Sequence, residues 1–240
     1  MSKKRENILN VTFIALFAAL CYISLMLFFF PVGIMYVHFG NMIVVMAALL
    51  IGGWQGGLAG SIGMGLYDLF NGHADSAPKT FLLKFLIGLT VGLVYIFLKN
   101  RKKYPSLALL ISGIVSLLIA LSLIIYDISA KNEKFDISIL CPIFIVIGIL
   151  CVLFSLLKNK FSHKTASAIV GASIGMLVNI TGEVLWKTVQ FFIAGSKFSA
   201  AFTGAVIAQG STLINAAIAI AGGVALFVLL EKPFSKIIEK

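Results

Sequence analysis

Charged residues are scarce in this chain. Only 12% of the 240 residues are Asp, Glu, Lys or Arg, whereas 60% are hydrophobic, and the mean hydropathy is +1.06. A soluble domain of this length needs far more polar surface. The composition therefore excludes a soluble globular protein and predicts an all-α integral membrane protein with several spans.

Cysteine and histidine are also rare, with three of each. The cysteines lie within apolar runs and form no CxxC motif, and no two histidines have the spacing of metal ligands on one helix. We therefore interpret the cysteines as small core residues and predict no metal site.

The motifs of common enzymes are missing. There is no P-loop, no HExxH and no paired-carboxylate site, and no histidine is placed to activate Ser61. We expect no catalytic residue, no cofactor and no means of hydrolysing ATP. An intramembrane lipid-modifying enzyme is the alternative, but only Asp68 and Glu183 lie in or beside a span away from the cytosol. A channel or secondary transporter would need ionisable residues along a continuous path.

Basic residues give the chain a net charge of +10, but they gather in short clusters between apolar runs. This is the positive-inside pattern of a membrane protein and not a nucleic-acid-binding stripe. With the N-terminus inside, thirteen Lys and Arg residues fall on the cytoplasmic side, four outside and two within spans. We therefore expect a multi-pass protein of the cell membrane with both termini in the cytoplasm.

The apolar runs predict eight helices, given that a span needs about 20 residues. They cover residues 8–30, 40–53, 55–71, 79–99, 105–126, 137–158, 164–194 and 200–230. The Gly-rich stretch 52–57 is expected to be the tight turn of a helical hairpin. Residues 105–158 are almost devoid of interior polar residues, so we interpret them as an inserted transmembrane hairpin between segments 1–104 and 159–240.

One polar stripe interrupts the helix expected over 164–194. Asn179, Glu183, Trp186 and Gln190 fall within about 60° of one another at 100° per residue. We interpret the stripe as a ligand site, in which Asn179 and Glu183 hydrogen-bond the ligand and Trp186 stacks on it. The alternative is an internal ion pair between Glu183 and Lys187, four residues apart.

Other polar residues could complete such a pocket. Lys84 either points inward to Glu183 or an anionic ligand group, or extends to the outer interface. Tyr36, His38 and Asn41 are expected in the first outer loop and the start of the next helix, where they would cap the pocket. In the last helix we favour Gln209 over Ser211 and Asn215, which lie on another face.

Small residues form a second pattern, because they let helices approach closely. Gly88 with Gly92, and Gly171 with Gly175, form GxxxG pairs that we expect to pack inside the molecule. Ala15 and Ala19 form AxxxA, which serves either internal packing or the docking of a partner.

The segments HFGNMIVVMAALLIGGWQGGLAGSIGMGLYDLF (38–70) and APKTFLLKFLIGLTVG (77–92) resemble the substrate-binding S components of energy-coupling factor (ECF) transporters, in particular those for vitamin B6 compounds or hydroxymethylpyrimidine. The resemblance is strong over residues 8–100 and looser over 164–231. It implies a six-helix core with cytoplasmic termini and a vitamin pocket in the outer half, roofed by the first loop. The hairpin over 105–158 departs from this pattern, because it replaces a short cytoplasmic loop.

The same resemblance implies the function and the partners. The chain would capture pyridoxine, pyridoxal or pyridoxamine outside the cell, or else a thiamine precursor such as hydroxymethylpyrimidine. Its partners would be a transmembrane coupling subunit, docked at Ala15 and Ala19, and two ATPase subunits. The residues expected to bind the substrate are Tyr36, His38, Asn41, Lys84, Asn179, Glu183, Trp186 and Gln209.

Overall fold

The fold was obtained as a computed structural model, which describes residues 3–32, 35–101, 141–156 and 162–239, together with isolated positions between 106 and 121. Its contacts divide the chain into two compact units. The core unit comprises Met1–Lys99, Ser167–Gly182 and Gly210–Lys240, and the second unit comprises Asn100–Ala166 and Glu183–Gln209.

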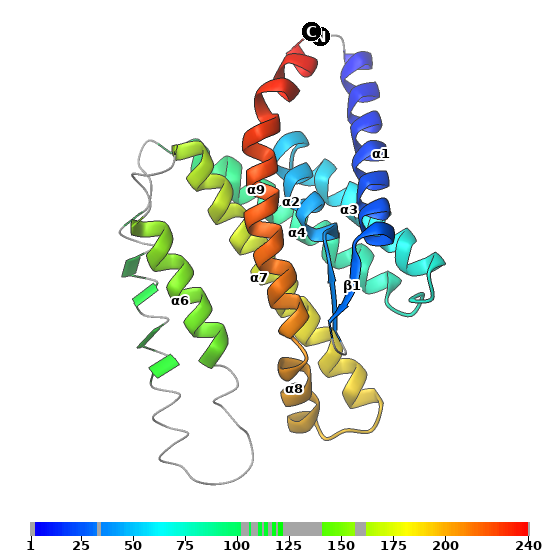
Figure 1. Cartoon of the computed structure of the whole chain (residues 1–240), viewed down its shortest axis with the longest axis vertical. Coiled ribbons are helices and arrows are strands. Elements are labelled where there is room, and N and C mark those ends of the chain that lie inside the picture. The colour runs from blue at the N-terminus through cyan, green and yellow to red at the C-terminus, as the bar shows by residue number, and fades with distance from the viewer. Residues whose placement is uncertain are drawn as a thin grey trace. The chain divides into compact units, whose positions relative to one another are not determined.

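The described residues are overwhelmingly helical, as Figure 1 shows. The helices are α1 (Lys3–Leu27), α2 (Gly40–Ile51), α3 (Gly53–Phe70), α4 (Ala77–Lys99), α6 (Cys141–Leu156), α7 (His163–Ile193), α8 (Phe198–Ile207) and α9 (Gly210–Glu239). By length and composition, four helices in the described ranges can cross a membrane, namely α1, α4, α7 and α9. The expected class of all-α membrane protein is therefore confirmed.

The first connection differs from the expectation. The helix expected to continue to residue 30 ends at Leu27, and β1 (Phe29–Val32) pairs with β2 (Met35–His38) as an antiparallel hairpin. Pro31 keeps the helix from reaching residue 30, because proline disfavours helical geometry in the residue before it. The aromatic and β-branched residues around it favour strands instead.

The junction between α2 and α3 is shorter than expected. The predicted turn over 52–57 was wrong in extent, because Gly52 alone separates the two helices and Gly53 already belongs to α3. Gly52 has φ of 100°, a conformation that side chains other than glycine rarely adopt. One left-handed residue is therefore enough to reverse the direction of the chain.

Glycines hold the helices of the core unit together. A Cβ atom added to Gly88 would lie 2.4 Å from the Cα of Gly57, and one added to Gly92 would lie 2.3 Å from the Cα of Gly53. The backbones of α3 and α4 are therefore in direct contact. The expectation that Gly88 and Gly92 pack inside the molecule is confirmed.

The ends of α1 and α9 meet within the core unit. The ring of Phe13 lies 4.6 Å from that of Phe234, and Phe17 lies 6.3 Å from the same ring. Pro233 stands inside α9 one residue before this contact. The two terminal helices thus lie side by side at their chain ends, as Figure 1 also shows.

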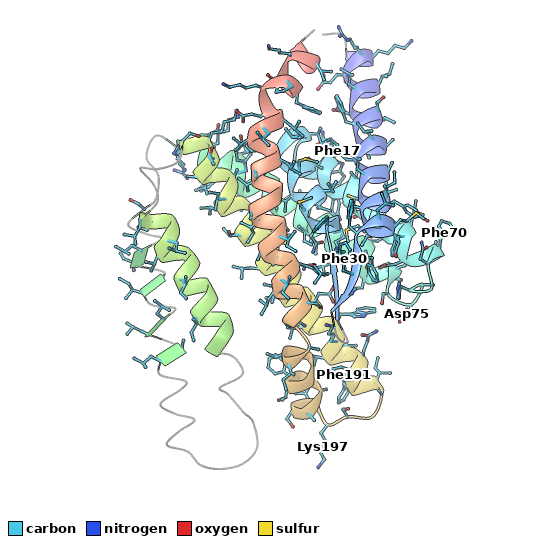
Figure 2. The ribbon with its side chains drawn as sticks, in the orientation of Figure 1. Phe17, Phe30, Phe70, Asp75, Phe191 and Lys197 are labelled. Carbon is cyan, nitrogen blue, oxygen red and sulfur yellow. The ribbon has the colours of Figure 1, made fainter. Side chains whose placement is uncertain are left out.

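The second unit contains α6, both ends of α7, and α8. The helix expected over 137–158 is described as α6, whereas most of the one expected over 105–126 lies outside the described residues. Figure 2 marks the end of α7 and the following turn with Phe191 and Lys197.

The single helix expected over 200–230 was wrong, because the chain turns at Ala208 and Gln209 between α8 and α9. The backbone N–H of Ala208 bonds to the carbonyls of Gly204 and Val206 and closes α8. Gln209 therefore lies in a turn and not in the middle of a helix.

Candidate functional site

A buried lysine and a buried asparagine form the centre of the candidate site in the core unit. Lys84 on α4 is 5% exposed, Asn179 on α7 is 2% exposed, and the Lys84 Nζ donates a hydrogen bond to the Asn179 Oδ1 at 3.1 Å. Extension of Lys84 to the outer interface, one of the two expected alternatives, is therefore wrong. Burial of an ammonium group is costly unless polar groups receive its protons.

The approach of α4 and α7 brings this pair together. A Cβ atom on Gly175 would lie 2.4 Å from the side chain of Val91, and one on Gly182 would lie equally close to that of Leu83, the neighbour of Lys84. The small residues of α7 thus let α4 come near enough for the Lys84 side chain to reach Asn179. The expected packing role of Gly171 and Gly175 is confirmed.

Asn41 is the most deeply buried polar residue at the start of α2. It is 1% exposed, and its Oδ1 is buried with no hydrogen-bond partner among the described residues. A buried carbonyl oxygen without a donor is rare in native proteins. The arrangement leaves Asn41 able to accept a hydrogen bond from a ligand.

The β-hairpin is anchored to the rest of the core unit. The backbone N–H of His38 donates to the Asn215 Oδ1 of α9 at 2.9 Å, and the His38 ring stacks on Phe29 at 8° between planes. The hairpin backbone pairs Tyr36 with Pro31. The sequence analysis favoured Gln209 over Asn215 as a pocket residue. An asparagine within an apolar span is nevertheless itself a signal of a polar contact.

The other expected ligand residues belong to the second unit. Glu183 and Trp186 are half-buried and Gln190 is exposed. Lys187 donates from its Nζ to the carbonyl oxygen of Ala208 at 2.9 Å. The polar residues predicted for one pocket are therefore distributed between the two units, with Tyr36, His38, Asn41, Lys84 and Asn179 in the core unit.

Ala15 and Ala19 lie on a different surface of the core unit. Both are exposed and contribute to a groove of about 490 Å³. The groove is almost wholly apolar and is lined by Ala15, Ala18, Ala19, Tyr22, Ile23, Ile62, Gly63 and Leu66. Among the candidate spans of the described chain, α1 is the least buried, at 28% of its apolar window. The AxxxA pair is thus available to another helix.

These features define a multi-pass helical membrane protein with a few polar side chains buried in an apolar core. The family model described as ECF-type riboflavin transporter, S component, matches residues 5–141. The chain belongs to this family of transporter components, so the resemblance noted in the sequence is confirmed at the level of the ECF S component. No match to this chain is found among curated proteins or among solved structures.

Proposed function

We propose that this chain is the substrate-binding subunit of an ECF importer and captures a vitamin B6 compound outside the cell. The buried Lys84–Asn179 hydrogen bond carries the proposal. An apolar membrane protein keeps such groups at a cost in stability, so polar residues within spans are functional candidates. Delivery into the cell would require a coupling subunit and two ATPase subunits, because this chain has no ATP-binding motif.

The chemistry of the candidate residues fits a small heteroaromatic vitamin. An ammonium and an asparagine amide can bind ring nitrogens, hydroxyls or an anionic group of such a molecule. The description of the family names riboflavin. Hydroxymethylpyrimidine shares a small aromatic ring with the vitamin B6 compounds. Both are therefore candidates beside pyridoxine, pyridoxal and pyridoxamine.

Titration calorimetry with pyridoxine, pyridoxal, hydroxymethylpyrimidine and riboflavin tests the proposal. We expect wild-type protein to bind one of them, and Lys84→Met to weaken that binding by roughly tenfold to a hundredfold, because a hydrogen bond to a charged group contributes about 1.5–3 kcal/mol. The double variant Lys84→Met/Asn179→Leu removes both members of the pair and is expected to bind as weakly as the single variant.

Lys197→Met is the matched control, because Lys197 is exposed in the turn before α8. It removes the same charge and is expected to leave affinity unchanged. Equal affinity of wild type and both Lys84 variants would assign the Lys84–Asn179 pair a purely structural role.

Membrane topology gives a second prediction, which concerns the termini and the inserted hairpin over 105–158. In a background without the three native cysteines, Asn132→Cys should react with an impermeant thiol reagent from outside, and Lys3→Cys and Lys102→Cys only from inside. The reason is the excess of basic residues on the proposed cytoplasmic side. Residues 102 and 132 lie outside the described residues. Labelling of positions 102 and 132 from the same side would contradict the hairpin.

A further inference from the structure

The first turn of α2 is buried in the core unit but has no side-chain cap. Phe39, the residue before the helix, makes no capping hydrogen bond with its side chain, and its carbonyl oxygen accepts from the N–H groups of Met42 and Ile43. The N–H groups of Gly40 and Asn41 lie in the first turn, where an α-helix has no acceptor of its own. Both residues are buried. Buried backbone donors need a partner, and this helix end supplies none from its own cap.

A hydrogen-bond acceptor lies beside these donors, on the side chain of Asn41. The residue is 1% exposed, and its Oδ1 is buried without a hydrogen-bond partner in the described part of the chain. In an α-helix the Cα–Cβ bond tilts toward the N-terminus, which is also the direction in which the backbone N–H points. The donor and the acceptor belong to one residue, so covalent geometry keeps both within reach of one small group.

Side chains of three elements enclose this turn. A Cβ atom added to Gly40 would lie 2.8 Å from the Cε of Met64 on α3 and 3.4 Å from the Nδ1 of His38 on β2. On α9, a Cβ atom added to Gly222 would lie 2.5 Å from the sulfur of Met42. The first turn of α2 therefore lies in the interior of the core unit, away from lipid and bulk water.

We propose that Asn41 recognises the transported molecule by an edge on which a hydrogen-bond donor lies beside an acceptor. The donor of this edge bonds to the Asn41 Oδ1, and its acceptor bonds to the backbone N–H of Asn41 at the positive end of the α2 dipole. A carboxylate has acceptors only, so it leaves the Oδ1 unpaired and is disfavoured. The inference rests on the proposed function and deepens it, because it names the chemical group that the site selects.

The candidate vitamins all carry such an edge. Riboflavin has a ring N–H between two carbonyls, hydroxymethylpyrimidine has an amino group beside a ring nitrogen, and pyridoxine has a hydroxymethyl group beside a phenolic oxygen. Each has an analogue that lacks the donor. These analogues are 3-methylriboflavin, the pyrimidine without its amino group, and 4-deoxypyridoxine.

Titration calorimetry compares each parent vitamin with its analogue on wild type and on Asn41→Leu, which has a similar size but no amide. We expect Asn41→Leu to bind the parent about tenfold more weakly and the analogue as well as wild type does, since only the parent donates to the Oδ1. Asn41→Ala, which cannot overpack the turn, should show the same loss of preference. Without ligand, the melting temperature of Asn41→Leu should equal or exceed that of wild type, because an unpaired polar group is removed from an apolar interior.

Ser173→Ala is the matched control in the core unit. Ser173 is 7% exposed, and its hydroxyl already donates to the carbonyl oxygen of Ile169 in its own helix at 2.9 Å. This variant should leave the preference for parent over analogue unchanged.

Two results would overturn the inference while the proposed function stands. They are equal losses for parent and analogue in both Asn41 variants, and unchanged affinity for the parent in both. Either result, like a lower melting temperature of ligand-free Asn41→Leu, would assign the polar groups of Asn41 to an ordered water or to the packing of α2. If wild type binds none of the parents, the proposed function fails, and the inference fails with it.

Discussion

Replacing Ala19 with tryptophan is expected to weaken assembly of this chain with a coupling subunit strongly while leaving vitamin binding unchanged. Ala15 and Ala19 line the apolar groove beside α3, and both are exposed. Small side chains at this spacing allow a helix of another subunit to approach closely. An indole ring would fill the groove and hold the two backbones apart.

The size of the effect follows from the cost of overpacking, about 1–3 kcal/mol for extra atoms in a well-packed contact. The affinity for the coupling subunit should fall by roughly fivefold to a hundredfold. The measurement is co-purification of the tagged chain with the coupling and ATPase subunits from cells that express all of them. Ala15→Trp is expected to behave in the same way.

Leu16→Trp provides the control, because Leu16 is an exposed residue of the same helix that does not line the groove. It adds a similar ring to a surface that would face lipid, and assembly should persist. If both alanine variants assemble normally, Ala15 and Ala19 have no role in docking. If Leu16→Trp also blocks assembly, the partner covers a wider face of α1 than the groove.

The double variant Gly88→Ala/Gly92→Ala is expected to cause a large loss of stability in the core unit. The added Cβ atoms would lie 2.4 Å and 2.3 Å from the Cα atoms of Gly57 and Gly53. These are backbone atoms that no side-chain rotation can move, so α3 and α4 must separate. Each substitution is expected to lower the free energy of unfolding by about 1–3 kcal/mol. The melting temperature should therefore fall by roughly 4 °C or more.

Gly204→Ala is the matched control for this prediction. The nearest atom to its added Cβ is in the Phe191 ring at 3.3 Å, which can shift slightly. Alanine also favours a helix over glycine by about 1 kcal/mol, so stability should be unchanged or slightly higher. Thermal unfolding in detergent measures both variants. An unchanged melting temperature in the double variant would mean that the α3–α4 contact is looser than these distances indicate.

Local sequence patterns were sufficient for the long helices. The ranges 79–99 and 164–194 correspond to α4 and α7 within two residues at each end, because an uninterrupted apolar run leaves a chain in lipid no other way to satisfy its backbone. The β-hairpin was missed, because strand pairing depends on partners several residues away and the pattern over 29–38 is as apolar as a helix. The turn at Ala208 and Gln209 was missed because no proline marks it and the apolar run resumes after it; Gly210, which follows it directly, was the one local signal.

The candidate site was only partly predictable. Sequence identified Lys84 and Asn179 as polar residues in apolar spans, but not that they bond to each other across 95 positions. That contact depends on the rotation of α4 and α7 about their axes, which is set by where glycines let the helices meet. The same holds for Asn215, whose bond to His38 depends on how β2 packs against α9.

The sequence by itself determined the class of this protein, because composition and the length of its apolar runs decide whether a chain is stable in a bilayer. It also determined the family, since the matching residues 5–141 carry that likeness. Only the tertiary structure decided which polar atoms pair and which are left over, because hydrogen bonds depend on distances of a few tenths of an ångström. Such distances arise when helices pack, and no local pattern encodes them.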